Sequence, residues 1–315
     1  MKAAVVFDPA TGPVYADFAA PNAEQGQHLV RVTASAISHV VKSRASGKHY
    51  SFDGTLPFIA GIDGTGVTEE GQRVYFAFPP TPWGSMAEFA PVDANLCLPL
   101  PDDLDDVTAA AMANPGMSAW AALITRAQLQ PGETVLINGA TGSAGQLAVQ
   151  IARYHGAGKI IVTGRNPQVL SSLGADECVN ITDDEQNIAQ QLSRLAAEGI
   201  DVVVDYLWGQ SALAILTALA KHTSSLNPVR YVQVGALSGA EIALPGAVLR
   251  SSPILMMGSG IGSLSMTQLI HATGEMLQAS VAGGFTIKTR QARLEDVADA
   301  WKSDDSKQRT VFVIR

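Results

Sequence analysis

A glycine-rich segment at residues 139–145 has the residue types and the spacing to hold a phosphate group. Its sequence is Gly-Ala-Thr-Gly-Ser-Ala-Gly, and it lies between an apolar run at 134–137 and a helical pattern that begins at residue 144. A strand, a glycine turn and a helix in this order bring backbone N–H groups and the positive end of the helix dipole to one point. The segment therefore predicts the pyrophosphate-binding turn of a dinucleotide site, with a tight turn that binds no ligand as the alternative. Gly142 and Gly145 are its strongest candidates, and the contacts are expected from Ala140, Thr141, Gly142, Ser143, Ala144 and Gly145.

The residues that follow the next expected strand indicate which dinucleotide would bind. NAD sites usually place Asp or Glu about 20 residues beyond the turn, where the carboxylate binds the ribose 2′-hydroxyl. Here Gly164, Arg165 and Asn166 occupy that position, and no acid is present. The guanidinium of Arg165 would pair with a 2′-phosphate, which an acidic side chain would repel. The sequence therefore favours NADPH, and a solvated surface arginine is the alternative interpretation of Arg165.

The composition is that of a globular chain with about two domains. The 315 residues are 47% hydrophobic and 16% charged, which permits a sizeable core. The formal net charge of -8 argues against nucleic acid or an anionic membrane surface as a partner. No apolar stretch approaches the roughly 18 residues of a membrane span. The two cysteines, Cys97 and Cys178, form no CxxC pattern, so we expect reduced thiols and a cytoplasmic location.

Strands and helices alternate regularly from residue 133 onward. Strands are expected at 134–138, 159–163, 201–206, 229–235 and 254–257, and helices at 144–155, 167–173, 185–198 and 210–221. This alternation predicts a parallel sheet with helices on both faces. The first third instead contains expected strands at 29–34, 71–77 and 85–92, which glycine and proline separate, and indicates a distinct β-rich domain. Between the two, we expect a helix at 105–112, a break at Pro115 and a new helix from residue 118. The tail is expected to complete the first domain, with a helix at 266–282, a strand at 285–288, a helix at 294–302 and a strand at 310–314.

Several segments, in this order, resemble the zinc-independent medium-chain dehydrogenase/reductases, in particular the quinone oxidoreductase group. They are residues 61–66 (Gly-Ile-Asp-Gly-Thr-Gly), 114–120, 139–145, 173–176 and 232–235. The resemblance implies an α/β chain with a GroES-like β-rich catalytic domain (1–117 and 261–315) and a Rossmann domain with a doubly wound parallel sheet (118–260). It also implies an active site between the domains, NADPH-dependent reduction of a quinone or an α,β-unsaturated carbonyl, and a homodimer with 241–245 as an interface element. An NADPH-binding protein without catalysis, crystallin-like or regulatory, is the alternative.

The same comparison predicts that no metal ion is bound. Ser38 stands where zinc-dependent relatives carry a cysteine, and Asp63 stands where they carry a His-Glu pair. Catalytic zinc needs three protein ligands and an open position, and His39 alone is more readily explained as a hydrogen-bonding residue. A conjugated acceptor spreads negative charge over its own atoms, so a hydrogen-bond donor and correct positioning suffice without a Lewis acid.

The expected donors lie near the segment that would border the substrate. They are Tyr50, Ser38 and Lys42. For Tyr50 the alternative is a partly buried packing role, and for Ser38 and Lys42 alike it is a surface or capping role.

The remaining cofactor contacts are expected from the ends of strands and from the segment that leads into the second domain. Asn114 and Ser118 are expected near the nicotinamide, with a helix N-cap as the alternative role of each. Trp208 is expected either to line the site or to pack. Arg309 is expected to be a surface charge, with contact to a phosphate as the alternative. The carboxyl edge of the sheet, where doubly wound folds bind their ligands, is expected to contribute Leu207, Gly235, Ala236, Leu237, Gly258, Ser259 and Gly260, with ordinary loop glycines as the alternative.

Overall fold

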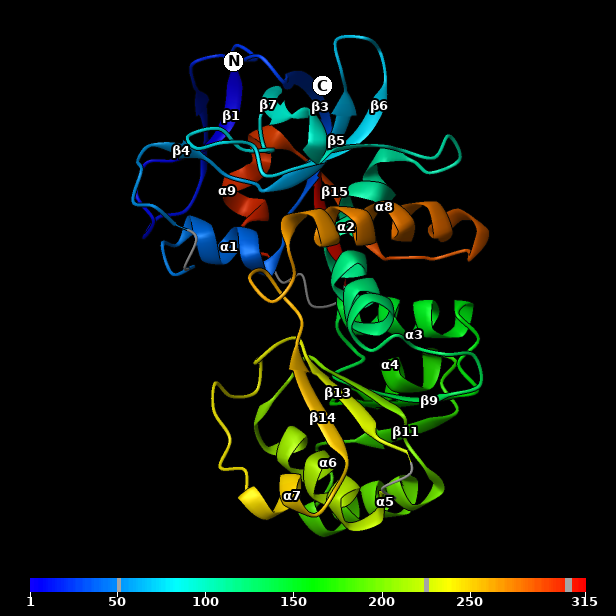
Figure 1. Cartoon of the computed structure of the whole chain (residues 1–315). Helices are drawn as coiled ribbons and strands as arrows, with labels where there is room; N and C mark the ends of the chain where they lie inside the picture. The colour runs from blue at the N-terminus through cyan, green and yellow to red at the C-terminus, as the bar shows by residue number, and fades with distance from the viewer. Residues whose placement is uncertain (50–51, 224–226, 304–307) are drawn as a thin grey trace. The chain divides into compact units, whose positions relative to one another are not determined.

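The computed structural model describes residues 1–49, 52–223, 227–303 and 308–315. The chain forms two compact units, Met1–Asn114 with Thr273–Arg315 and Pro115–Ala272 (Figure 1). The boundaries expected from the sequence lay after residues 117 and 260. The observed boundaries lie after Asn114 and after Ala272. The later one falls inside the long helix α8 (Met266–Ala282), so this helix contributes residues to both units.

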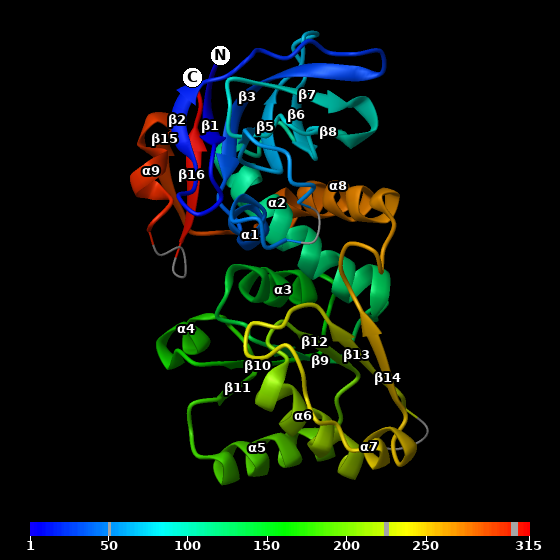
Figure 2. The same ribbon diagram turned by 90° about the vertical axis from the view of Figure 1, so that its left-hand side faces the viewer.

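The unit formed by Pro115–Ala272 contains a six-stranded parallel sheet in the order β11-β10-β9-β12-β13-β14. Because the chain starts at a central strand and adds strands first on one side and then on the other, this is the doubly wound Rossmann order, with its switch point between β9 and β12. Figure 2 shows α3 on one face of the sheet and α5 and α6 on the other. The elements are β9 (Thr134–Asn138), α3 (Ser143–Tyr154), β10 (Lys159–Gly164), α4 (Pro167–Ser172), β11 (Glu177–Asn180), α5 (Glu185–Glu198), β12 (Val202–Asp205), α6 (Gly209–His222), β13 (Val229–Gln233), α7 (Gly246–Arg250) and β14 (Ile254–Gly258).

The strands and helices expected from 134 to 257 are therefore confirmed within one or two residues at each end, and β11 and α7 are additions. The interior of the sheet is apolar except near the strand ends, where Asn138, Thr163 and Asp205 are also buried, and every residue of β12 is buried. Helices α5 and α6 contribute leucine, isoleucine and alanine to the core on their face of the sheet. Because all six strands are parallel, their carboxyl ends lie at one edge of the sheet.

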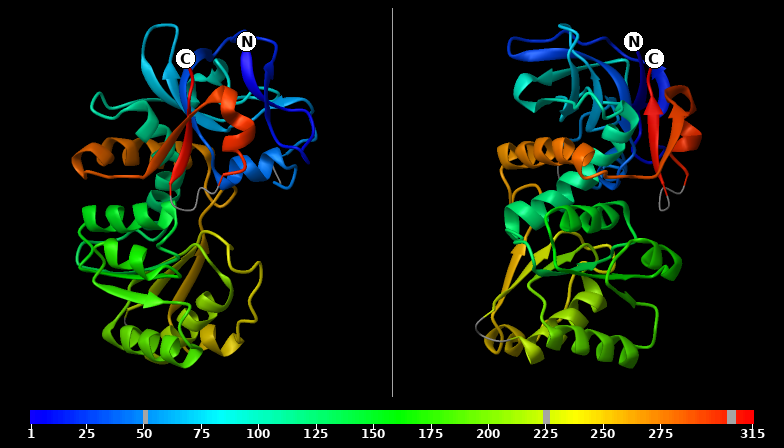
Figure 3. Two further views of the ribbon diagram at one scale, coloured as in Figure 1. Left: turned by 180° about the vertical axis from the view of Figure 1, so that it is seen from behind. Right: turned by 90° about the vertical axis from the view of Figure 1, so that its right-hand side faces the viewer.

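The unit formed by Met1–Asn114 and Thr273–Arg315 is β-rich, as expected. A seven-stranded sheet runs in the order β15-β16-β3-β5-β6-β8 with β7 paired to β3, and a three-stranded sheet runs β2-β1-β4. The C-terminal strand β16 pairs antiparallel with β3, so the tail completes this unit and both termini lie in it (Figure 3). Its elements are β1 (Lys2–Val6), β2 (Val14–Asp17), β3 (Gln27–Ala36), α1 (His39–Ala45), β4 (Phe58–Ile59), β5 (Asp63–Val67), β6 (Arg73–Ala77), β7 (Phe89–Asp93), η1 (Ala94–Leu96), β8 (Cys97–Pro99), β15 (Thr289–Arg293), η3 (Leu294–Asp296), α9 (Val297–Ala300) and β16 (Arg309–Val313).

The strand expected at 285–288 is wrong. The observed strand β15 begins at Thr289, and the backbone N–H of Phe285 instead donates to Ser280 O at 2.9 Å. This bond closes the C-terminal turn of α8, and Phe285 is buried there. A buried apolar residue directly after the last turn of a helix gives the same sequence signal as the first residue of a strand.

The break expected at Pro115 is also wrong, because α2 (Asp106–Trp120) continues through it and is followed by a π-helical turn, η2 (Ala121–Arg126). Pro115 removes one backbone donor from the helix interior. The alanine-rich part of α2 packs closely into the core against β3 and β16, with Ala110 and Ala111 almost fully buried. This tertiary packing outweighs the local cost of the proline.

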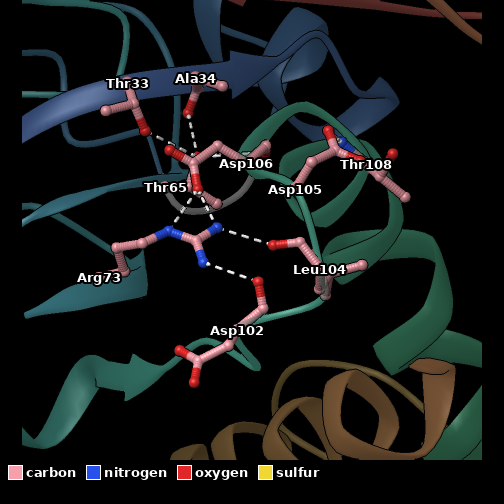
Figure 4. A network of polar contacts seen from close by, with 9 residues as sticks. All are labelled: Thr33, Ala34, Thr65, Arg73, Asp102, Leu104, Asp105, Asp106 and Thr108. Carbon is pink, nitrogen blue, oxygen red and sulfur yellow. Dashed lines mark hydrogen bonds and ion pairs between the residues drawn. The ribbon is translucent and has the colours of Figure 1, made fainter. Parts of the chain in front are cut away.

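The start of α2 is fixed to the sheet by Arg73 (Figure 4). The guanidinium of Arg73 pairs with Asp106 Oδ1 at 2.6 Å and donates to the carbonyl oxygen of Leu104 at 2.7 Å. On the other side, the hydroxyl of Thr65 donates to the carbonyl oxygen of Asp106 at 3.2 Å, and Asp105 Oδ1 caps the helix by accepting from the N–H of Thr108 at 2.9 Å. This network sets the position of the helix that carries Asn114 and Ser118.

Candidate dinucleotide-binding site

The glycine turn lies between β9 and α3, as the sequence predicts. Gly142 is the N-cap of α3, with φ -81° and ψ 164°, and no side chain caps this helix end. The first-turn N–H groups of a 12-residue helix therefore point out of the turn without a capping side chain of their own. This arrangement suits an anion.

The glycines of the turn are required for different reasons. A Cβ on Gly145 would lie 2.5 Å from Ala140 Cα and from the carbonyl oxygen of Gly139, so the close packing of α3 on β9 requires glycine there. Gly139 has a φ of +94°, which disfavours any other residue. At Gly142 a Cβ would meet only Gly139 O, at 3.9 Å, and φ is negative. Within the described residues nothing requires glycine at position 142, which fits a backbone that a ligand approaches closely.

The three residues proposed from the sequence to recognise a 2′-phosphate follow β10, beside the turn. A Cβ on Gly164 would lie 2.5 Å from Thr141 Cγ2, so glycine at 164 lets the glycine turn pack on β10. Asn166 Oδ1 accepts from the N–H of Val169 at 3.2 Å and caps α4. Arg165 is exposed between them, and the described part of the chain shows no ion pair for it. Its guanidinium is thus placed at the sheet edge where an anion could be bound.

The other candidates of this unit lie at the carboxyl ends of β12, β13 and β14. Leu207 covers the turn, because a Cβ on Gly139 would lie 2.8 Å from Leu207 Cγ. Gly235 packs against the backbone of Tyr206 after β13, and Ala236 and Leu237 follow it, the last of these 69% exposed. The residues after β14 differ: a Cβ on Gly258 or on Gly260 would meet nothing within 4 Å, while Ser259 is buried and donates its N–H to the carbonyl oxygen of Gln233 at 2.9 Å.

The side chain of Trp208 packs in the core rather than at this edge. It contacts the apolar cluster between the sheet and helices α5 and α6. Its ring lies 6.5 Å from the ring of Tyr231, at an interplanar angle of 71°. Of the two interpretations of Trp208, packing is the one that the structure supports.

Asn114 and Ser118 both lie inside α2, half-buried and four residues apart, so they share one face of the helix. The alternative in which either residue is a helix N-cap is therefore wrong. Their contact with a nicotinamide stays a prediction.

The candidate donors Ser38 and Lys42 lie at α1. Ser38 is buried and caps this helix, with Oγ accepting from the N–H of Val41 at 3.1 Å. Lys42 Nζ donates to the carbonyl oxygen of Ser303 at 3.4 Å. Tyr50 lies outside the described residues.

Arg309 is not the surface charge that we expected. It is 7% exposed at the start of β16 and lies near the buried carboxylate of Asp63. Burial raises the pKa of Asp63 to about 6, while the charge of Arg309 and a hydrogen bond from the Tyr75 hydroxyl, at 3.1 Å, oppose this rise. A buried arginine is costly because its charge loses contact with water, and the nearby carboxylate of Asp63 offsets part of this cost.

Sequence reasoning missed a buried polar row directly below the glycine turn. Thr163, Asn138 and Asp205 are register partners on the adjacent strands β10, β9 and β12. The hydroxyl of Thr163 donates to Asn138 Oδ1 at 2.6 Å, and Asn138 Nδ2 donates to Asp205 Oδ1 at 2.7 Å. The available signal was a polar residue near the end of each of these apolar strands: Asn138 and Asp205 at the last position, and Thr163 one position before the last.

A β-rich unit joined to a Rossmann unit that carries a glycine turn defines a dehydrogenase/reductase architecture, and known proteins with it are similar to this chain. The family profile described as zinc-binding dehydrogenase matches residues 144–278. A probable NADPH-dependent quinone reductase of Emericella nidulans is 28% identical over 348 residues, which cover 96% of each chain. The quinone oxidoreductase of Homo sapiens is 29% identical over 320 residues, which cover 95% of this chain and 92% of that protein.

The phthioceranic/hydroxyphthioceranic acid synthase of Mycobacterium tuberculosis is 34% identical over 223 residues, and the match spans 67% of this chain and 10% of that longer protein. Among solved structures, the quinone oxidoreductase of Thermus thermophilus, which was also crystallised in complex with NADPH, has a TM-score of 0.81 at 24% identity and covers 99% of this chain and 100% of that one. This likeness confirms the GroES-like plus Rossmann fold. The chain belongs to the medium-chain dehydrogenase/reductase superfamily and is quinone oxidoreductase-like.

Proposed function

We propose that this protein is an NADPH-dependent reductase that transfers a hydride to a quinone or an α,β-unsaturated carbonyl without a metal ion. The observation that carries the proposal is Gly142, a glycine at a helix N-terminus that the chain's own packing does not require. The exposed guanidinium of Arg165 at the next strand end supports NADPH over NADH. The names of the relatives from Emericella nidulans and Homo sapiens support a quinone as the acceptor.

In this proposal the chain binds and orients its cofactor through the carboxyl edge of the parallel sheet. The N–H groups at the start of α3 bind the pyrophosphate, and Arg165 binds the 2′-phosphate. The open backbone at Gly258 and Gly260 accommodates the nicotinamide end, together with Asn114 and Ser118. Bound NADPH supplies the hydride.

The proposed hydrogen-bond donors to the acceptor are Tyr50, Ser38 and Lys42. Ser38 Oγ accepts a hydrogen bond as the cap of α1, which leaves its own hydrogen available to donate. Lys42 carries three N–H donors on its ammonium group. A donor at the acceptor's carbonyl oxygen would stabilise the negative charge that develops there.

The residues at the positions of the zinc ligands support chemistry without a metal. The Ser38 hydroxyl caps a helix, and the Asp63 carboxylate accepts from Tyr75 and faces Arg309. Three potential ligands gather among the described residues only at His28, Glu69 and Glu70, where His28 Nδ1 lies 3.6 Å from Glu70 Oε2 at the surface. An imidazole beside two exposed carboxylates is a common surface arrangement and does not by itself indicate a metal site.

The proposal is tested by the oxidation of NADPH with a panel of quinones and enones, in the presence and the absence of a chelator. We expect turnover with at least one acceptor, unchanged by the chelator. Tight binding of NADPH with no turnover on any acceptor would favour the alternative, a protein that binds NADPH without catalysis. Loss of activity on chelation would contradict the metal-free mechanism.

We also propose that the protein is a cytoplasmic homodimer. Strand β14 is the edge of the parallel sheet, and Leu255 on β14 and Leu249 on α7 are each about half exposed. Together with residues 241–245, this edge offers backbone and apolar side chains to a second copy. None of the helices in the described residues is long and apolar enough to cross a bilayer. A monomeric mass by light scattering would contradict the dimer.

A further inference from the structure

Asp205 is fully buried at the last position of β12, and four donors converge on its carboxylate. Oδ1 accepts from Asn138 Nδ2 at 2.7 Å, and from the backbone N–H groups of Leu207 and Trp208 at 2.9 and 3.0 Å. Oδ2 accepts from the hydroxyl of Tyr231 at 2.7 Å. A carboxylate without water needs such donors, and their number shows that this one is built into the structure.

The first connection runs from Asp205 to the glycine turn. Asn138 Nδ2 faces the carboxylate, which only accepts, so Asn138 Oδ1 faces the other way and accepts from the Thr163 hydroxyl at 2.6 Å. The Thr163 oxygen accepts in turn from the N–H of Gly139 at 3.1 Å. The first residue of the turn is thereby joined to Asp205 through hydrogen bonds that all point in one direction. They cross the sheet at its switch point, where doubly wound folds bind ligands.

The second connection runs through the loop that follows β12. Trp208 has φ 58° and ψ -150°, a backbone conformation that residues other than glycine rarely adopt. The bonds from Leu207 and Trp208 to Asp205 Oδ1 hold the loop in this shape. In that shape the side chain of Leu207 lies against Gly139, where a Cβ would come within 2.8 Å of it. Asp205 therefore supports Gly139 from two directions, through Asn138 and through Leu207.

We propose that Asp205 is a positioning residue for the nucleotide: its carboxylate holds Asn138 and the 207–208 backbone, and so fixes the glycine turn in the shape that takes the pyrophosphate. The ligand in this inference rests on the proposed function. Asp205 makes no contact with the reacting atoms in this role. Its loss should weaken the binding of NADPH far more than it slows the chemical step.

The test compares two aspartates at opposite ends of the same strand region. Asp201 Oδ2 accepts from the N–H of Thr134 at 2.8 Å, so it also joins β12 to β9, but at the edge away from the turn. For Asp205→Ala we expect the Kd of NADPH, measured by calorimetry on the full chain, to rise at least about tenfold, with kcat at saturating NADPH within about threefold of the unmodified protein. For Asp201→Ala we expect a Kd within about twofold of the unmodified protein.

A conservative variant separates the loss of the acceptor from general disruption. In Asp205→Asn the amide oxygen can keep the donors Asn138, Leu207 and Trp208, and the amide nitrogen faces the oxygen of Tyr231, which can accept. We expect this variant to restore the Kd to within about threefold of the unmodified protein. If Asp205→Ala does not fold, Asn138→Ala tests the same connection, because it leaves three of the four donors on Asp205; there we expect a Kd at least about fivefold higher.

The outcomes distinguish this inference from the proposed function. If the unmodified protein does not bind NADPH, the proposed function fails. If it binds NADPH and folded Asp205→Ala and Asn138→Ala both bind it within about twofold of the unmodified protein, the positioning role is overturned. Equal weakening by Asp201→Ala and Asp205→Ala would also overturn it, because the effect would then reflect stability alone.

Discussion

Each unit of this protein buries an aspartate against a tyrosine hydroxyl from a neighbouring strand, but the two carboxylates are held in different ways. Asp63 on β5 accepts from Tyr75 at 3.1 Å and faces the charge of Arg309. Asp205 on β12 accepts from Tyr231 at 2.7 Å and from three N–H donors as well. Burial and the adjacent carboxylate raise the pKa of both tyrosines, so both hydroxyls remain protonated and donate.

The comparison shows that depth of burial alone does not decide what a carboxylate does in a fold. Asp63 and Asp205 are 4% and 0% exposed, which is nearly the same. The donors around Asp205 join the 207–208 loop and strand β13 to the strand that leads into the glycine turn, so Asp205 supports the shape of that turn. Asp63 has fewer donors, and burial raises its pKa to about 6, so it changes its protonation in an ordinary working range.

The largest expected effect is the loss of stability in Asp205→Ala. The substitution leaves the hydroxyl of Tyr231 and two backbone N–H groups without this acceptor, and Asn138 Nδ2 keeps only its bond to Ser211 Oγ, at 3.0 Å. We expect the free energy of unfolding to fall by about 4 kcal/mol, as measured by urea denaturation. In the matched variant Asp201→Ala one backbone donor at a half-buried edge is affected, and the expected loss is about 1 kcal/mol. Equal losses in the two variants would show that the converging donors carry no special weight.

The second effect is a pH dependence that comes from Asp63. Its pKa is about 6 in the folded chain and 3.8 when unperturbed, so the folded state binds the proton more tightly. The stabilisation is therefore complete below about pH 4 and is lost as the pH rises through about 6, by ~3 kcal/mol. Asp63→Asn stays neutral and should lack this loss. Urea denaturation of both proteins from about pH 4 to about pH 7 is the measurement, and parallel profiles would refute the assignment to Asp63.

The third effect concerns an exposed charge, in contrast to the buried Arg309. Arg165→Glu places a carboxylate where the 2′-phosphate is proposed to bind, so the Kd of NADPH should rise by roughly 30-fold, about 2 kcal/mol, while the Kd of NADH changes little. Arg165→Lys retains the charge without the planar fork, and we expect a loss of a few-fold. Calorimetric titration with both dinucleotides measures the preference. An unchanged preference for NADPH in Arg165→Glu would remove Arg165 from the site.

The smallest effect separates the two tyrosines. Tyr231→Phe removes one of four donors to Asp205, and the free energy of unfolding should fall by about 1 kcal/mol, while the hydrogen bond of Asp63 to Tyr75 is unchanged. Tyr75→Phe removes a hydrogen bond that lowers the pKa of Asp63, so this pKa should rise further. The midpoint of the pH-dependent loss of stability should then move upward in Tyr75→Phe only. A shift in both variants, or in neither, would contradict the contrast between the two carboxylates.

Local patterns were sufficient for much of the fold. The alternation of apolar runs and helical periods predicted the strands and helices from β9 to β14 apart from β11 and α7, because a buried parallel strand and an amphipathic helix differ strongly in period. The glycine turn was equally visible, since strand, glycines and helix are adjacent in the chain. The errors at Pro115, at 285–288 and at Arg309 share one cause. In each case a contact with another part of the chain, distant for Pro115 and Arg309 and five residues away for Phe285, changes what the residue type would favour alone.

The sequence by itself determined the Rossmann unit, the glycine turn and the candidates at the strand ends, because these signals need only neighbouring residues. Only the tertiary structure decided how the turn is supported. The bond from Asn138 to Asp205 joins residues 67 positions apart, and the bond from Thr163 to Asn138 joins residues 25 positions apart. Parallel strands place such residues side by side through the register of the whole sheet, which no local pattern contains. A buried aspartate therefore looks the same in the sequence whether it will support a turn, as Asp205 does, or respond to pH, as Asp63 does.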